Sequence, residues 1–191
     1  MRRKANNREI SKSVGGSIKP FLRWPGGKRW LIPIFREELQ NFRPKRYFEP
    51  FLGGGALFFS MYQTPSVLGD INSELVNTYV QVKDNPTKLI NELRKLRVTR
   101  ENYYKMRDLQ FSSPILSAVR FLFLNRTSFS GLYRLNRKGR FNVPFGGGVR
   151  THETLWRDGL IINASRALQS AQVIRADFEE VIHLAQKGDL V

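Results

Sequence analysis

A chain of 191 residues with a hydrophobic fraction of 41% is long enough for one domain with a buried core, or for a domain that carries a smaller insertion. Its formal net charge of +16 predicts a polyanionic partner, most simply a nucleic acid, with an anionic membrane as the rival. The absence of cysteine excludes disulfides and thiolate metal sites, two distant histidines leave little for a zinc site, and no apolar run approaches the roughly 20 residues that cross a bilayer.

Residues 1–18 predict a disordered basic arm. They contain five Lys or Arg, one acid and no aromatic residue, so they lack the means to pack against a core. Such an arm either holds phosphates or serves as a solubilising tail. The stretch also lacks the apolar segment of a signal peptide, so we expect a soluble, cytoplasmic protein with no membrane partner.

The next stretch, residues 19–30, reads KPFLRWPGGKRW and predicts a tight turn followed by an amphipathic helix from Trp30 to Leu39. A phosphate-cradling Walker loop would need glycine at the position of Leu22 and Ser or Thr at that of Arg29, so the NTPase interpretation fails. An aromatic ring, two glycines and a lysine at a helix start suit a ligand with a flat ring and a carboxylate. In the alternative interpretation, Trp24 is a core plug beside a structural turn.

The stretch 47–70 predicts the first half of a nucleotide-binding βαβ unit. A short strand leads through the glycine triplet 53–55 into an apolar helix, and a second strand ends on Asp70. Glycines let the backbone approach a ligand, and an acid at a strand's carboxyl end is placed to accept hydrogen bonds from both hydroxyls of a ribose. Phe58 replaces the third glycine of GxGxxG, which favours a nucleoside ligand without a pyrophosphate. An ordinary flexible turn is the alternative for the triplet.

Helices are predicted over most of the segment that follows. The first is capped by Asn72 or Ser73 and stopped by Pro86. Further helices are expected at 87–96, 103–109 and 115–124, and the last of these is so uniformly apolar, apart from Arg120, that it predicts a buried helix.

Between Asp108 and Glu153 the sequence has no acidic residue, and residues 125–148 interleave arginine, aromatic, small polar and glycine residues. This mixture predicts a surface loop or hairpin that grips phosphates and reaches base edges. Arginine pairs bidentately with a guanine edge, while Lys138 and its neighbours neutralise backbone charge. A solvated basic loop is the alternative.

The last part of the chain returns to α/β character. A helix is expected at 160–171, a strand at 172–176, a second helix at 178–186 capped by Asp177, and the opening of another strand at 189–191. In open α/β sheets, ligands are handled at the carboxyl ends of the strands. We therefore expect that a strand broken off after three residues has lost what its carboxyl end would present.

Four motifs in this order resemble the Dam-type (D12 class) DNA adenine N6-methyltransferases: FLRWPGGK from Phe21, FEPFLGGGA from Phe48 with GDIN from Gly69, the segment from Asn125 to Gly146, and ADF from Ala176. The resemblance covers residues 19–191. It implies an α/β fold with an incomplete, Rossmann-like S-adenosylmethionine-dependent methyltransferase sheet and an inserted helical and hairpin target-recognition region. The implied domains are a cofactor-binding unit, 19–72 with 165–191, and a DNA-binding insertion, 73–164.

The resemblance also implies the site residues. The cofactor S-adenosylmethionine would contact Trp24, Lys28, Phe51, Gly53, Asp70, Asp177 and Phe178, with Trp24 and Lys28 at its methionine part, Asp70 at its ribose, and Asp177 and Phe178 beside its adenine. Double-stranded DNA, with GATC as the usual target, would contact Phe129, Ser130, Leu132, Arg134, Arg137, Lys138 and Pro144. Ser130 stands where many relatives carry asparagine, so the exact target stays open. The implied location is the nucleoid in the cytoplasm.

The family's catalytic Asp-Pro-Pro-Tyr motif follows the strand that begins here at Asp189, and these 191 residues do not contain it. The N6 lone pair of adenine is delocalised into the ring, so an acid and a carbonyl must accept its hydrogens while an aromatic ring stacks on the flipped base. We therefore assign no catalytic and no metal-binding residue. We expect the chain to be inactive by itself and to be truncated, interrupted or completed by a second chain.

Three hypotheses follow. The first is an adenine-specific DNA methyltransferase, serving restriction-modification, replication or phage biology. The second is a non-catalytic DNA-binding remnant or regulatory protein. The third, a protein that coats nucleic acid, fits the charge but does not explain the motifs at Trp24, Lys28 and Asp70.

Overall fold

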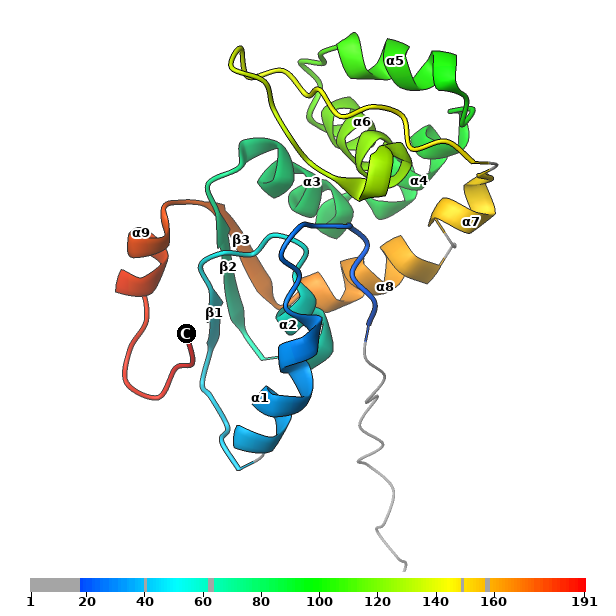
Figure 1. Cartoon of the computed structure of the whole chain (residues 1–191). Helices are drawn as coiled ribbons and strands as arrows, with labels where there is room; N and C mark the ends of the chain where they lie inside the picture. The colour runs from blue at the N-terminus through cyan, green and yellow to red at the C-terminus, as the bar shows by residue number, and fades with distance from the viewer. Residues whose placement is uncertain (1–17, 40, 62–63, 149, 157–158) are drawn as a thin grey trace, which may run out of the picture.

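The computed structural model describes residues 18–39, 41–61, 64–148, 150–156 and 159–191 (Figure 1). All but the last residue of the predicted basic arm lie outside these ranges. The centre of the fold is a three-stranded parallel sheet in the order β1–β2–β3, formed by Tyr47–Glu49, Ser66–Asp70 and Ala171–Arg175. This α/β arrangement agrees with the sequence prediction.

The segment around Leu190 pairs with the free edge of β1, where the sequence predicted the opening of a strand at residues 189–191. Tyr47 and Leu190 form a parallel bridge, and the N–H of Phe48 donates to the carbonyl of Leu190 at 2.8 Å. The spatial order is therefore β3, β2, β1 and then the Leu190 segment, so later chain segments lie on both sides of β1 and β2.

Helices cover both faces of the sheet (Figure 1). On one face, Val181 of α9 (Phe178–His183) packs with Phe48 and Val67. On the other, α3 (Ser73–Asp84) and α8 (Gly159–Leu168) lie against β3. Leu68 belongs to the larger core on that side. Strands buried on both faces need successive apolar residues, and β2 has them at Val67 and Leu68.

A second group of helices packs beyond α3. It contains α4 (Pro86–Arg94), α5 (Arg100–Asp108), α6 (Pro114–Thr127) and α7 (His152–Trp156). The central one, α6, contacts α3, α4 and α5 and buries ten residues, as its uniform apolar sequence predicted. Helix α3 thus serves both the sheet and this helical group.

The basic segment after α6 forms an open hairpin that runs alongside α6 in Figure 1. It starts with the short 3₁₀ turn η2 (Phe129–Gly131), and its two sides pair at two antiparallel bridges, Ser128 with Phe145 and Leu135 with Phe141. We refer to residues 128–146 as the basic hairpin. The structure therefore agrees with the hairpin form of the sequence prediction.

The predicted amphipathic helix from Trp30 to Leu39 is the main local difference. It is divided into the 3₁₀ turn η1 (Arg29–Leu31) and α1 (Ile32–Glu38), which packs near α2 (Ala56–Met61). Pro33 lacks an N–H and fits only the first turn of a helix, so α1 begins beside it. Neither element buries a residue, and Trp30 is 71% exposed.

Three element boundaries near the end of the chain differ from the predicted ones. Helix α8 ends at Leu168 because Ala171 already begins β3, and α9 ends at His183.

Within the described residues, no helix combines the length and the apolar character that a bilayer-spanning segment requires.

Candidate functional site

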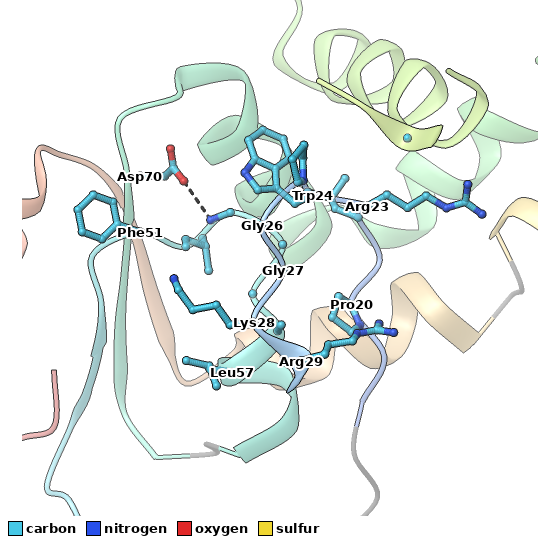
Figure 2. A pocket seen from close by; sticks show the side chains of 18 of the residues that line it. Pro20, Arg23, Trp24, Gly26, Gly27, Lys28, Arg29, Phe51, Leu57 and Asp70 are labelled. Atoms are coloured by element: carbon cyan, nitrogen blue, oxygen red, sulfur yellow. Dashed lines mark hydrogen bonds between the residues drawn. The ribbon is translucent and has the colours of Figure 1, made fainter. Parts of the chain in front are cut away.

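A cavity of about 700 Å³ opens where β1 and β2 end (Figure 2). Its walls come from three separate parts of the chain: the turn before η1, the loop between β1 and α2 together with Asp70, and the root of the basic hairpin with the end of α6. Five of the seven predicted cofactor residues line it, namely Trp24, Lys28, Phe51, Gly53 and Asp70. Two of the predicted DNA-contact residues, Ser130 and Leu132, line it as well.

The glycine loop is held tightly rather than left open. Gly53 has a φ of +48°, and a Cβ at this position would lie 2.7 Å from Cδ1 of Trp24. Its N–H donates to Oδ2 of Asp70 at 3.0 Å, and its carbonyl accepts from the hydroxyl of the buried Tyr79 at 3.0 Å. Only glycine satisfies both the positive φ and the close indole. The flexible-turn alternative therefore does not describe this loop.

Asp70 has acceptor capacity left for a ligand. Its Oδ2 accepts from Gly53, and its Oδ1 accepts from the N–H of Asn72 at 2.9 Å. A carboxylate offers about two acceptor sites on each oxygen, so roughly one site on each stays available toward the cavity. Asn72 also caps α3 by accepting from the N–H of Leu75 at 3.1 Å. The end of β2 and the start of α3 thus fix the carboxylate at the cavity wall.

The position of Trp24 is compatible with both interpretations that the sequence left open. Its indole lines the cavity and also stacks on Tyr133, with ring centroids 5.2 Å apart, and on Phe121 at 6.2 Å. The preceding residue is clamped to α6, because the side-chain amide of Asn125 donates to the carbonyl of Arg23 at 2.6 Å and accepts from its N–H at 3.0 Å. The turn is therefore attached to the helical group as well as to the sheet.

A buried acid in the cavity wall was not singled out from the sequence. Glu49 ends β1, is only 8% exposed and lines the cavity. Burial raises the pKa of its carboxyl from 4.5 to about 7, against the opposing effects of Tyr47, the N–H of Phe58 at 3.3 Å and the charge of Lys28. The available signal was a glutamate directly after two strand formers, where a buried strand would place it.

We expect Glu49→Gln to remove a pH dependence of stability. The folded chain holds the Glu49 proton more tightly than the unfolded chain, so folding free energy is lost as pH rises from 4.5 toward about 7. The loss is at most about 3 kcal/mol. Urea unfolding at pH 5 and pH 8 measures it. Glu101→Gln, at an exposed position, is the control and should keep the wild-type change in unfolding free energy between the two pH values. The same change in Glu49→Gln would contradict the assignment of the raised pKa to Glu49.

Two predicted cofactor residues lie outside the cavity wall. Phe178 stacks on Phe51, with centroids 5.3 Å apart and planes 21° apart, so it extends the aromatic edge of the cavity. Phe178 is 40% exposed and Phe51 is 62% exposed. Asp177 caps α9 by accepting from the N–H of Glu179 at 3.1 Å. Phe178 therefore borders the cavity by its contact with Phe51, which lines it, and Asp177 precedes Phe178 in the chain.

The predicted DNA-contact residues are spread along the basic hairpin. Phe129 is 55% exposed at the root, where its N–H donates to the carbonyl of Pro144 at 2.9 Å. Ser130 has a φ of +52°, a strained conformation for a residue other than glycine. Arg134 donates from Nε to Oδ1 of Asn142 at 2.8 Å. The side chains at the tip, Arg137 and Lys138, are exposed.

Cations are also concentrated in the cavity wall, which includes Arg23, Lys28, Arg29 and Arg126. The only carboxylates among its lining residues are Glu49 and Asp70. Among the residues that the structure describes, no group of three potential metal-ligating side chains is present. The cations of the wall offer partners for anionic groups of a ligand, and the carboxylates offer acceptors for hydroxyl groups.

Comparison with known proteins gives consistent matches. A family model for the D12 class N6 adenine-specific DNA methyltransferases matches residues 24–191. The chain is 38% identical over 188 residues to the Type II methyltransferase M1.LlaDCHI of Lactococcus lactis subsp. cremoris, covering 92% of this chain and 64% of the relative. It is 35% identical over 187 residues to the Type II methyltransferase M.MjaIII of Methanocaldococcus jannaschii, covering 86% of this chain and 64% of the relative. It is 34% identical over 180 residues to the DNA adenine methylase of Haemophilus influenzae, covering 91% of this chain and 62% of the relative. The chain thus spans less than two thirds of the length of these relatives.

Proposed function

The chain belongs to the D12 class of N6 adenine-specific DNA methyltransferases, and from this premise we propose that it builds the S-adenosylmethionine site and the DNA-reading hairpin of an enzyme that methylates adenine N6 in duplex DNA. The sheet is the incomplete Rossmann-like sheet of such a methyltransferase. The shared cavity carries the proposal, because Trp24, Lys28 and Asp70 come from separate segments and line one space together with the hairpin root.

The cavity wall offers a group for each part of the proposed cofactor. S-adenosylmethionine supplies an electrophilic methyl group on a sulfonium when bound. Asp70 accepts from the two ribose hydroxyls with the acceptor sites that its backbone partners leave. Lys28 holds the carboxylate of the methionine part next to Trp24, and the exposed face formed by Phe51 and Phe178 receives the adenine ring.

The hairpin root brings DNA to the same cavity. Ser130 and Leu132 line the cavity, whereas Arg134 and the tip residues lie further along the same hairpin. Enzymes that modify a base in duplex DNA extrude it into a pocket, so an adenine that leaves the helix beneath the hairpin would meet the cofactor. We propose a GATC-like target. Ser130 stands where many relatives carry asparagine, so we expect this residue to account for any difference between the recognised DNA sequence and theirs.

Arg134→Ala is expected to relax specificity at one base pair. The hydrogen bond with Asn142 fixes the direction of the guanidinium, which suits bidentate pairing with a guanine edge. The discrimination lost is about 1 to 3 kcal/mol, measured by competition between target and single-substitution duplexes. Lys138→Ala at the exposed tip is the control and should weaken all duplexes alike. An equal loss on every duplex for Arg134→Ala would make it a phosphate contact instead.

We expect a polypeptide of residues 1–191 to bind cofactor and DNA without transferring methyl. The 191 residues include no Asp-Pro-Pro-Tyr motif, Glu49 is buried, and the acceptor sites left on Asp70 are assigned to the ribose hydroxyls. Calorimetry with S-adenosylmethionine and gel shift with a GATC duplex test the two sites, and labelled methyl incorporation tests transfer. Incorporation would contradict this account, and absence of both binding events would contradict the proposed function.

A further inference from the structure

Tyr133 connects the basic hairpin to two parts of the cavity wall. It lies between Leu132, which lines the cavity, and Arg134, the proposed base reader. Its ring stacks on the Trp24 indole, with planes 25° apart, and packs against Phe141 on the other side of the hairpin at 5.8 Å. A displacement of the hairpin therefore moves a ring that holds the indole in place.

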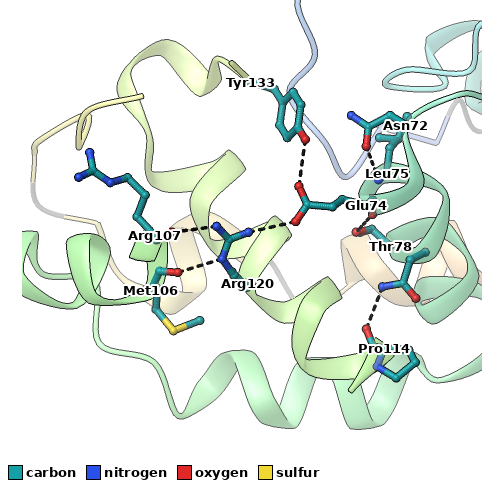
Figure 3. A network of polar contacts seen from close by, with 10 residues as sticks. Asn72, Glu74, Leu75, Thr78, Met106, Arg107, Pro114, Arg120 and Tyr133 are labelled. Atoms are coloured by element: carbon teal, nitrogen blue, oxygen red, sulfur yellow. Dashed lines mark hydrogen bonds and ion pairs between the residues drawn. The ribbon is translucent and has the colours of Figure 1, made fainter. Parts of the chain in front are cut away.

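The hydroxyl of Tyr133 makes a second connection (Figure 3). It donates to Oε2 of Glu74 at 2.9 Å. Glu74 lies in the first turn of α3, the helix whose N-cap, Asn72, donates its N–H to Asp70. The same tyrosine thus contacts Trp24 through its ring and, through its hydroxyl, the helix start that positions Asp70.

Glu74 is itself rigidly held. Its Oε1 accepts from Nη1 of the buried Arg120 at 3.0 Å, and that guanidinium also donates to the carbonyls of Met106 and Arg107 at 3.0 and 2.8 Å (Figure 3). Burial and the neighbouring Glu74 carboxylate raise the pKa of the Tyr133 hydroxyl, so it stays a donor over the physiological range. The hydrogen bond therefore has a fixed acceptor and a permanent donor.

We propose that Tyr133 is a positioning residue that makes cofactor binding and DNA binding depend on each other. This inference rests on the proposed function. A cofactor that restricts the motion of Trp24 and Asp70 also restricts Tyr133 and hence the hairpin. A duplex that restricts the motion of the hairpin acts in the reverse direction. Such coupling is reciprocal and is measured as one factor, the ratio of S-adenosylmethionine dissociation constants without and with duplex.

The key variant is Tyr133→Phe, which keeps the ring against Trp24 but removes the hydrogen bond to Glu74. We expect a coupling factor of about tenfold in the wild-type chain, within the usual range for linked sites. In Tyr133→Phe the factor should fall clearly below the wild-type value because the link to Glu74 is lost, while the dissociation constant of the cofactor without duplex changes less than about twofold because the stacking stays.

The matched control is Tyr103→Phe. The Tyr103 hydroxyl donates to the carbonyl of Val143 at 2.8 Å, so it also anchors the basic hairpin, but its ring packs on Tyr104 and Phe145 rather than on the Trp24 indole. A merely structural role for Tyr133 predicts that the two variants behave alike. The inference predicts weaker DNA binding with an intact coupling factor in Tyr103→Phe.

Hydrogen exchange gives a second measurement on the same proteins. The N–H groups of Asn136 and Asn142, which donate across the hairpin, should exchange more slowly when S-adenosylmethionine is added to the wild-type chain, and this slowing should be smaller in Tyr133→Phe. Binding of both ligands with a coupling factor of one in the wild type, or with an intact factor in Tyr133→Phe, overturns the inference alone. Failure of the wild type to bind either ligand overturns both the inference and the proposed function.

Discussion

Asp70→Ala is expected to weaken S-adenosylmethionine binding by about a hundredfold or more. Hydrogen bonds to a charged acceptor contribute about 1.5 to 3 kcal/mol each, and the carboxylate is proposed to accept one from each ribose hydroxyl. The two N–H groups that it accepts from Gly53 and Asn72 also lose their partner, so the loop and the start of α3 loosen. Calorimetry with purified variant and wild-type chains measures the change.

The control for Asp70→Ala is Asp84→Ala. Asp84 is exposed at the end of α3 and lies outside the cavity wall, so its removal should leave cofactor affinity unchanged. Thermal unfolding of both variants separates lost binding from lost folding. A folded Asp70→Ala chain that binds the cofactor within about twofold of the wild type would remove the ribose role, since two charged hydrogen bonds cannot be lost at so small a cost.

The sheet and the cavity-lining segments were predictable because their signals are local. Strand formers followed by a glycine triplet, and a short strand that ends on Asp70, indicate where parallel strands stop. Carboxyl ends of neighbouring parallel strands meet at one edge, which is where the structure places Glu49 and Asp70 in one cavity wall. The apolar run of α6 likewise predicted that this helix is buried.

Other features depend on which segments meet, and no local pattern encodes that. Arg120 stood out as the one charge in an apolar helix, but its partner, Glu74, lies 46 residues away. The same is true of the Trp24 indole, whose packing on Tyr133 decides how the hairpin meets the cavity. The helix predicted from Trp30 to Leu39 shows the opposite case, because its apolar periodicity is real but α2 covers it only in part and none of the residues in η1 and α1 is fully buried.

Arg120→Met is expected to be the most destabilising change in the helical group, at about 2 to 4 kcal/mol. The side chain of Arg120 is 9% exposed, and its loss leaves Glu74 and the carbonyls of Met106 and Arg107 without their donor. Glu74 is 32% exposed, so water partly replaces the lost partner and the cost stays below that of a fully buried pair. Urea unfolding measures the change in unfolding free energy.

A control ion pair and a double variant test the cause of this loss. Lys95→Met removes the cation from the exposed pair with Glu92 and should cost less than about 0.5 kcal/mol. Adding Glu74→Gln to Arg120→Met removes the unpaired carboxylate, so the double variant should regain part of the stability. If Arg120→Met costs no more than Lys95→Met, or if the double variant regains nothing, the buried charge does not hold the helical group together.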